Sequence, residues 1–277
     1  MRSAPSDRHR TRRGPPNASR LPARREAVAG PLARYSESFA GTIIQTGGAS
    51  VANVGNRVRL TIERPSRALI ERFRDADPPD LADAMNKSGA MREIHPIYRP
   101  MARCVGPAVT VKAPTGDSLM IRKAMSIAQA GDVIVIDGRG TISRSLWGGN
   151  RSTFVAQKGV AGVVIDGATR DIGETQEARL PLFARAVCPM ASASSGPGEV
   201  NFPISCGGVA VHPGDIVVAS EEGIVVIPRD DAEDVCAAWR LIVDREKEMH
   251  VGAAAGRQGG TDEIDRLLSQ LKTEIVP

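Results

Sequence analysis

Aromatic residues, paired cysteines and long apolar runs are all scarce in this sequence of 277 residues. Aromatic side chains make up 3% of the chain and hydrophobic residues 42%, so we expect a core built from Val, Ile, Leu and Ala. The four cysteines form no CxxC pair, which removes the usual spacing of a zinc ribbon. Because there is no secretory segment and no apolar run long enough to span a bilayer, we expect a cytoplasmic protein with reduced thiols and no membrane partner.

The sequence also lacks the short motifs that mark several large enzyme classes. It contains no GxSxG, no GxxxxGK[ST] and no HExxH, so it offers no nucleophile elbow, phosphate-binding loop or paired zinc histidines. The four histidines are isolated and are expected to be structural or exposed. Gly138-Arg139-Gly140 follows a predicted strand, as a dinucleotide-binding loop does, but the third glycine and the acidic residue on a second strand are absent.

Positive charge is concentrated at the beginning of the chain. Nine Arg and two acidic residues give residues 1–34 a charge of +7, so the remainder carries −3 of the net +4. Residues 1–55 are rich in Arg, Pro, Ser, Ala and Gly without apolar periodicity, and we expect them to be a disordered extension. This extension is either a basic tail or transit peptide, or a segment that folding does not need. The mildly acidic remainder disfavours a nucleic-acid-binding face.

The central stretch, residues 131–174, predicts a unit of strand, glycine-rich loop, helix and strand. Its two apolar runs, Val133–Ile136 and Val163–Ile165, are short, β-branched and followed by Asp-Gly. Each therefore predicts a buried strand that ends at its Asp-Gly dipeptide. Between them, Ser152–Lys158 predicts a short helix that a glycine ends.

The rest of the chain alternates short predicted strands with helices and shows no internal repeat, which indicates one α/β domain over residues 56–250. A linker and a short helix are expected over residues 251–277. The helix predicted over 230–250 has one apolar side, which needs a partner in the same subunit or in a neighbouring one. Predicted strands cover 104–112, 182–186, 208–211, 215–219 and 224–227, and predicted helices cover 67–74, 80–88, 118–130, 230–250 and 262–271.

Arg170, Asp171 and Glu174 are the residues that best suggest a chemical role. Ligands of α/β sheets bind beyond the carboxyl ends of the strands, so Arg170-Asp171 and the glycines at 148–149 are expected to converge on one pocket. An Arg there can form a fork of hydrogen bonds with a substrate carboxylate. Asp171 and Glu174 share one side of a helix and offer oxygen ligands that suit Mg²⁺ or Mn²⁺. The alternative is that Asp171 only caps a helix, with Glu174 as its partner in a capping box.

At these residues the chain closely resembles the RraA-like proteins, which include the 4-hydroxy-4-methyl-2-oxoglutarate aldolases, also called HMG/CHA aldolases. The resemblance spans roughly residues 65–245 and is carried by TVKAPTGDSL, GDVIVIDG, LWGGN, GVAGVVIDGATRD, GGVAVHPGD and EEGIVVIP. It implies an α/β fold, a layered β/β/α domain related to swivelling phosphohistidine domains, with flanking helices. It also implies a homotrimer or homohexamer with its sites at subunit contacts.

The resemblance further implies roles for single residues. In the family, the Arg of the Arg-Asp pair holds the substrate and the Asp binds the divalent metal. These are Arg170 and Asp171 here, and Glu174 completes the motif. Backbone N–H groups of a loop 22 to 19 residues before that Arg bind the pyruvate part of the substrate, and this loop is Gly148-Gly149-Asn150-Arg151. Many of the aldolases carry Asp or Glu where this chain has Gly149, a departure that implies a looser arrangement around the metal.

The expected function is therefore that of a divalent-metal-dependent lyase that cleaves a 2-oxo dicarboxylate to pyruvate. Aldol cleavage and decarboxylation, the latter as of oxaloacetate, pass through the same enolate, so the sequence does not separate them. One alternative is a non-catalytic regulator, because some members of the family inhibit a ribonuclease and lack the intact motif. A methyltransferase acting on a quinone precursor, a label carried by some relatives, finds no supporting cofactor loop in this sequence.

Overall fold

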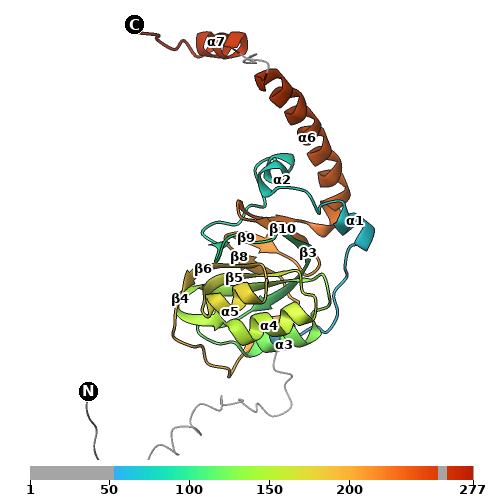
Figure 1. Ribbon diagram of the computed structural model, residues 1–277, viewed down its shortest axis with the longest axis vertical. Coiled ribbons are helices and arrows are strands. Elements are labelled where there is room, and N and C mark those ends of the chain that lie inside the picture. Colours follow the sequence, from blue (N-terminus) through green and yellow to red (C-terminus); the bar gives the residue numbers. More distant parts are fainter. Residues whose placement is uncertain (1–52, 255–260, 277) are drawn as a thin grey trace, which may run out of the picture. The chain divides into compact units, whose positions relative to one another are not determined.

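The computed structural model describes residues 53–254 and 261–276 (Figure 1). Most of the extension predicted over residues 1–55, and most of the break predicted after residue 251, lie outside the described residues. Among the described helices, none is both long and apolar enough to cross a membrane. The elements are β1 (Asn56–Val58), α1 (Arg67–Glu71), α2 (Pro78–Ala84), β2 (His95–Pro96), β3 (Cys104–Lys112), α3 (Leu119–Ile127), β4 (Val133–Trp147), α4 (Gly149–Gln157), β5 (Gly162–Thr169), α5 (Ile172–Glu177), β6 (Leu182–Val187), β7 (Gly198–Val200), β8 (Ile204–Cys206), β9 (Val209–Val211), β10 (Ile216–Ser220), β11 (Gly223–Ile227), the 3-10 helix η2 (Arg229–Asp231), α6 (Ala232–Ala254) and α7 (Thr261–Gln270).

The main sheet is built around four parallel strands, β3, β4, β5 and β6, which lie side by side in chain order. Antiparallel β7 and β2 flank them, and β1 pairs parallel with β7. Parallel neighbours need crossover connections, and α3, α4 and α5 supply them. These three helices lie together on one face of the sheet in Figure 1.

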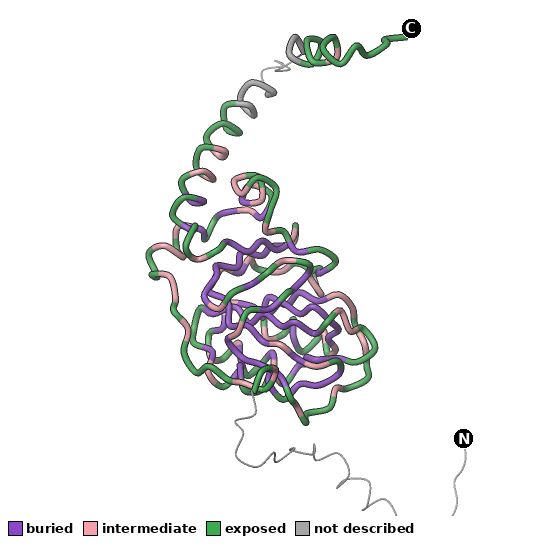
Figure 2. Tube along the Cα trace, turned by 180° about the vertical axis from the view of Figure 1, so that it is seen from behind, coloured by how far each residue is buried: buried purple, intermediate pink, exposed green. Residues whose placement is uncertain are grey.

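Alternate side chains of the parallel strands pack into two separate cores. In β4, Ile134 and Ile136 face the core under α3 and α4, whereas Val133 and Val135 face the opposite core. Burial on both faces explains why this strand reads as a continuous apolar run rather than an alternating one. Figure 2 shows the resulting buried trace through the middle of the domain.

A second β layer covers the other face of the sheet. β10 and β11 form an antiparallel hairpin, and β10 also pairs with the first half of β3, whereas the second half of β3 pairs with β4. β3 therefore belongs to both layers. The far side of the hairpin packs against α2 and α6 through a third core that includes Leu81 and Cys236. These layers confirm the expected α/β class, with stacked sheets and flanking helices.

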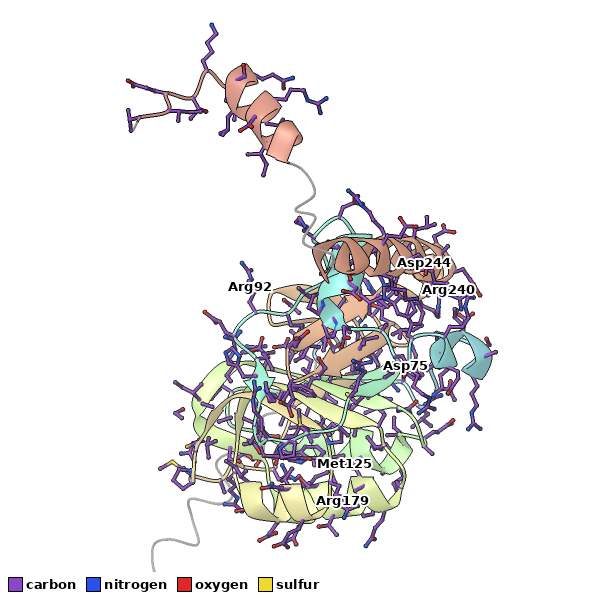
Figure 3. All side chains as sticks on the ribbon, turned by 45° about the horizontal axis from the view of Figure 1, so that its top comes forward. Asp75, Arg92, Met125, Arg179, Arg240 and Asp244 are labelled. Carbon is purple, nitrogen blue, oxygen red and sulfur yellow. The ribbon has the colours of Figure 1, made fainter. Side chains whose placement is uncertain are left out.

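The apolar side of α6 is covered over its first turns by the same chain. Val235 is buried against α2 and the β10–β11 hairpin, and the ring centroids of Trp239 and Phe73 are 6.4 Å apart. Farther along, Arg240 and Asp75 line one hollow beside this helix (Figure 3). Over these turns, the apolar side of α6 therefore packs within its own subunit, which is one of the two partners that the sequence pattern allowed.

Most predicted elements are present, with shifts at their ends. β3 covers the predicted range, and α4 begins at Gly149 rather than at Ser152, so the glycine loop forms the first turn of the helix. α6 continues to Ala254, beyond the predicted end. Four strands were not predicted, because segments of two or three residues are too short to show a clear alternating pattern; these are β1, β2, β7 and β8.

The prediction that β4 and β5 end at their Asp-Gly dipeptides is wrong. β4 continues to Trp147 and β5 to Thr169, and these two residues are paired. Beyond Asp137 the register of β4 shifts several times, and Arg139 and Gly140 have φ angles of 56° and 67°. Such a bulge lets a strand leave the ladder and rejoin it, and glycine makes the required backbone accessible. Both strands consequently end together at the same edge of the sheet.

Candidate functional site

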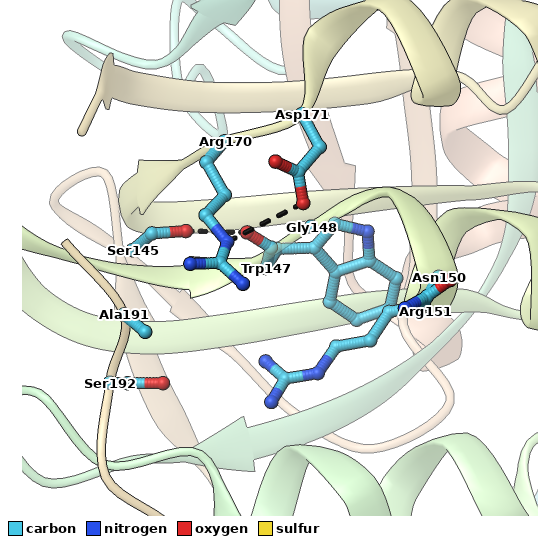
Figure 4. Close-up of a pocket in the computed structure, with 9 residues that line it drawn as sticks. All are labelled: Ser145, Trp147, Gly148, Asn150, Arg151, Arg170, Asp171, Ala191 and Ser192. Carbon is cyan, nitrogen blue, oxygen red and sulfur yellow. Dashed lines mark hydrogen bonds and ion pairs between the residues drawn. The ribbon is translucent and has the colours of Figure 1, made fainter. Parts of the chain in front are cut away.

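A cavity of about 230 Å³ lies at the carboxyl ends of β4 and β5. Its walls come from the end of β4, the first turn of α4, the turn after β5 and the segment that follows β6 (Figure 4). This is the edge of an α/β sheet at which ligands bind. The lining residues are Ser145, Trp147, Gly148, Asn150, Arg151, Arg170, Asp171, Ala191 and Ser192.

Arg170 and Asp171 both face this cavity because the chain turns sharply between β5 and α5. Asp171 has φ 56° and ψ 51°, in the left-handed region that Asp tolerates better than most residues. The Arg170 backbone N–H donates to the Trp147 carbonyl at 3.1 Å, which ties the turn to the end of β4. Arg170 Nε then lies 3.4 Å from Asp171 Oδ2. In an extended chain these adjacent side chains would point to opposite sides.

Asp171 occupies the N-cap position of α5, yet its carboxylate does not cap that helix. Its Oδ2 instead accepts a hydrogen bond from the backbone N–H of Gly149, at 3.2 Å, from the start of α4. The other oxygen, Oδ1, has no hydrogen-bond or ion-pair partner among the residues that the structure describes. The geometry therefore disfavours the alternative in which Asp171 serves only as a helix cap.

The glycine loop is the first turn of α4, at the positive end of the helix dipole. The resemblance implied that backbone N–H groups of this loop bind the pyruvate part of the substrate. In the structure the Gly149 N–H donates to Asp171, and the Arg151 N–H donates to the Gly148 carbonyl at 3.0 Å. The N–H groups of Gly149 and Arg151 are thus paired within the chain, and substrate binding by this loop stays a prediction.

Glu174 lies against Gly149 rather than in the wall of the cavity. A β-carbon added at Gly149 would come within 1.9 Å of Glu174 Oε2. The missing side chain at position 149 is therefore what gives Glu174 its space. In this structure the Glu174 carboxylate occupies the place that a side chain at position 149 would need.

Arg151 carries the least compensated charge at the site. Its Nη1 donates to the Leu146 carbonyl and its Nη2 donates to Ser118 Oγ at 2.9 Å. No carboxylate of the described chain pairs with it. Burial, and then the nearby guanidinium groups of Arg122 and Arg170, lower the pKa of Arg151. Since an arginine nevertheless stays charged, the cavity has a positive field that favours an anionic ligand.

A buried chain of hydrogen bonds fixes the elements beneath the cavity. Trp147 Nε1 donates to Ser152 Oγ at 2.9 Å, and Ser152 Oγ lies 2.8 Å from Thr175 Oγ1. Thr175 Oγ1 in turn donates to the backbone carbonyl of Asp171 at 3.2 Å. Trp147, Ser152 and Thr175 are all buried. The chain links β4, α4 and the turn that carries Asp171.

Four of the residues that line the cavity were not predicted from the sequence, namely Ser145, Trp147, Ala191 and Ser192. Trp147 directly precedes the glycine loop in the LWGGN segment, and this neighbourhood could have indicated that it lies at the cavity. The segment after β6 reaches the cavity through backbone pairing: Ser145 N–H donates to the Met190 carbonyl at 2.7 Å, and Ser192 N–H donates to the Ser145 carbonyl at 3.1 Å. Such pairing between distant segments leaves no local pattern in the sequence.

The donor set suits a hard divalent cation. Asp171 is the only carboxylate among the lining residues, and nowhere in the described ranges do three His, Cys, Asp or Glu side chains converge. Mg²⁺ commonly keeps several waters and uses only one or two protein carboxylates, so this does not count against it. Asp171 fits that requirement, because Gly149 and Arg170 hold one oxygen and the other has no partner among the residues that the structure describes.

Comparison with known proteins gives the cavity a family context. The family model described as RraA-like, Aldolase/RraA, matches residues 78–226, which include every lining residue. The chain is similar to a 4-hydroxy-4-methyl-2-oxoglutarate aldolase of Thermus thermophilus, with 35% identity over 154 residues, or 56% of this chain and 93% of the relative. A protein of Halalkalibacterium halodurans whose name proposes the same activity is 38% identical over 173 residues, or 62% of this chain and 79% of that relative.

Solved structures show the same fold. The RNA-processing inhibitor RraA from Thermus thermophilus is 34% identical with a TM-score of 0.52, covering 56% of this chain and 93% of its own. An uncharacterized protein from Pseudomonas syringae pv. tomato is 27% identical with a TM-score of 0.62, covering 71% of this chain and 97% of its own. The names of these relatives point to two different activities, cleavage of a 2-oxo acid and inhibition of RNA processing.

Proposed function

Because this chain belongs to the RraA-like, Aldolase/RraA family, we propose that it is a divalent-metal-dependent lyase that cleaves a 2-oxo dicarboxylate to pyruvate. The observation that carries the proposal is the Arg170–Asp171 pair facing one cavity with the guanidinium of Arg151, which forms no ion pair with a carboxylate of the described residues. Two guanidinium groups and one carboxylate give the cavity a net positive charge. A substrate with two carboxylates would be attracted to such a cavity.

Asp171 is the residue that would hold the cation, through the oxygen that has no partner in the described chain. When bound there, a divalent cation supplies Lewis-acid chemistry toward a 2-oxo acid. Arg170 pairs with a substrate carboxylate and offsets the negative charge that develops as the carbon–carbon bond breaks. The positive end of α4, at Gly148 and Asn150, adds to this stabilisation. Glu174, behind Gly149, acts indirectly by orienting water near Asp171.

The proposal covers aldol cleavage and decarboxylation, because both leave the same pyruvate enolate. The charge of that enolate would lie beside Arg170 in either case. Oxaloacetate and 4-hydroxy-4-methyl-2-oxoglutarate are therefore both substrates to test.

We also propose that the protein is a homotrimer or homohexamer, as the family resemblance implies, and that it is cytoplasmic without a nucleic-acid or membrane partner, as its composition led us to expect. Ile142, Val187 and Met190 support the proposed assembly, because each is more than half exposed and lies on a segment that borders the cavity. Exposed apolar side chains around a site suit a subunit contact. Light scattering at micromolar concentration tests the assembly, and a monomer there would rule out a site shared between subunits.

Pyruvate release tests the proposed activity. It is to be measured from oxaloacetate and from 4-hydroxy-4-methyl-2-oxoglutarate, with Mg²⁺ or Mn²⁺ and with a chelator. We expect release with the metal and its loss with the chelator. If neither substrate yields pyruvate with either metal, the protein is better explained as a non-catalytic regulator that binds and inhibits a ribonuclease, in line with the name of the Thermus inhibitor.

Substitutions then test the two central residues. Asp171→Ala should abolish pyruvate release, whereas Asp171→Asn keeps the left-handed turn and one oxygen and should recover weak activity at high Mn²⁺. Arg170→Lys should lower kcat/KM by about 30- to 150-fold if the lost fork is worth about 2–3 kcal/mol. Glu174→Gln should be milder, and Arg179→Lys, at an exposed arginine outside the cavity, is the matched control. Wild-type turnover by Asp171→Asn with a chelator present would refute the metal site.

A further inference from the structure

A second cavity, of about 500 Å³, adjoins the first between α3 and α4. The two cavities share Arg151 and Ser192 as lining residues. The other residues that line the second cavity are Ser118, Arg122, Met125, Ser126, Phe154 and Ser194. We propose that the two cavities form one substrate site, in which Arg151 and Arg122 bind a carboxylate at the far end of the substrate. This inference rests on the proposed lyase function.

Arg151 connects the two cavities. Its side chain extends from the first turn of α4, and its guanidinium lies on the side of the cavity where Ser192 is found (Figure 4). Two of its five N–H donors are used by the Leu146 carbonyl and by Ser118 Oγ. These internal partners are neutral, so they orient the guanidinium without cancelling its charge. The guanidinium of Arg151 is therefore fixed in orientation, remains charged and still has N–H donors for a ligand.

Arg122 adds a second cation without a counter-ion. It is exposed on α3, and its Nη1 donates only a long hydrogen bond of 3.4 Å to Ser194 Oγ. Within the described chain, neither Arg122 nor Arg151 pairs with a carboxylate. The two guanidinium groups are close enough that Arg122 contributes to the lowered pKa of Arg151. Two neighbouring positive charges without a counter-ion favour a bound anion.

The rest of the second cavity indicates what would carry that anion. Met125 on α3 and Phe154 on α4 both line the cavity, and Phe154 is 48% exposed. The two helices therefore offer apolar surface to a ligand. The serines add hydroxyl groups around the arginines. An arm of methylene groups that ends in a carboxylate matches this combination. The site therefore favours extended 2-oxo dicarboxylates over oxaloacetate, whose two carboxylates are separated by only two carbons.

Binding of two inert 2-oxo acids tests this inference. 2-Oxoadipate and 2-oxohexanoate have the same number of carbons and differ in the far carboxylate, and neither has the 4-hydroxyl or 3-carboxyl group that cleavage requires. Calorimetric titration with Mg²⁺ present should show wild-type protein binding 2-oxoadipate at least about tenfold more tightly, as expected for a charge-assisted contact. Arg122→Gln should remove most of that preference. Lys123→Gln removes an equal charge from an exposed neighbour outside the lining, and should keep the preference.

Three outcomes would overturn the inference. They are equal binding of the two acids to the wild-type protein, binding of neither acid, and an equal loss of preference in Arg122→Gln and Lys123→Gln. Because the measurement needs no turnover, an inactive protein that still prefers 2-oxoadipate would refute the lyase and leave the carboxylate site standing. An active lyase without this preference for 2-oxoadipate would support the proposed function and refute the carboxylate site. Melting temperatures of both variants confirm that they are folded.

Discussion

At position 171, one backbone conformation decides how a carboxylate is used. N-cap residues normally have extended backbone, which lets their side chains turn back to the first N–H groups of their helix. Asp171 instead has a left-handed backbone, and its carboxylate reaches across to Gly149 and Arg170. Spacing alone left the cap and the metal ligand as alternatives, because both need an acid at this place. Strained residues of this kind are a reason to look for function.

The contact between Gly149 and Glu174 leads to the first prediction. Gly149→Ala should lower the free energy of unfolding by about 1–3 kcal/mol, because the new β-carbon overlaps the Glu174 side chain. In a Glu174→Gly background the same change should cost less than half as much, since the overlapping atoms are gone. Gly173→Ala is the control, because an added β-carbon there meets nothing within 4 Å. Equal losses in both backgrounds, measured by chemical denaturation, would show that the two residues do not compete for space.

The same residues show what a sequence can and cannot predict about a site. That Arg170-Asp171 and the glycine loop meet followed from two buried strands and the rule for carboxyl ends. The overlap of Glu174 with position 149 depends on how α4 and α5 lie against each other, and spacing within one helix carries no information about that. Arg151 was predicted to bind the substrate through its backbone N–H. In the structure it is the charged side chain of Arg151 that faces the two cavities.

Among the elements, β4 illustrates why the ends of strands are hard to predict. Its apolar run correctly indicated a buried strand, because β-branched residues fill both cores. Its Asp-Gly dipeptide resembles a turn, but the neighbouring strand continues past it and offers hydrogen bonds with which β4 can resume. Tertiary pairing therefore overrides the local signal. The same continuation brings Trp147 to the cavity.

The buried hydrogen bonds between α4 and α5 give the second prediction. Ser152→Ala removes the hydroxyl that accepts the hydrogen bond from the indole N–H of Trp147. Trp147 is only 1% exposed, so water cannot replace this acceptor. A buried donor left unpaired costs about 1–3 kcal/mol, which for a domain of this size corresponds to a fall of roughly 2–12 °C in melting temperature. Thr153→Ala, at an exposed position one residue on, is the matched control. If both variants melt at the same temperature, this chain of hydrogen bonds does not stabilise the two helices.

At the scale of the whole molecule, contacts of Gly55 and of the first described strand hold the beginning of the described domain in place. The extension predicted over residues 1–55 stays a prediction. However, Gly55 N–H donates to Glu199 at 3.0 Å, Arg57 forms an ion pair with Glu199 at 2.6 Å, and β1 pairs with β7. Burial raises the pKa of Glu199, but the hydrogen bonds from Gly55 and Arg57 outweigh it and lower the pKa below 4.5. A truncation that began near Val58 would remove both donors.

The last prediction compares a chain that starts at Asn53 with one that starts at Arg59. The first should melt like the full-length protein, because it keeps every contact that Gly55 and Arg57 make with the described residues. The second should melt lower at pH 7, since it loses β1 and leaves Glu199 without its two nearest donors. A carboxylate whose pKa is lowered by folding stabilises the native state above its ordinary pKa, and that contribution is lost as the pH falls through the folded value. The difference in melting temperature between the two chains should therefore become smaller as the pH falls from 7 to below 4.5, the ordinary pKa of this group. The part of the difference that is due to β-pairing should remain. Equal melting at pH 7, or a gap that is unchanged in acid, would show that Glu199 does not anchor this end of the domain.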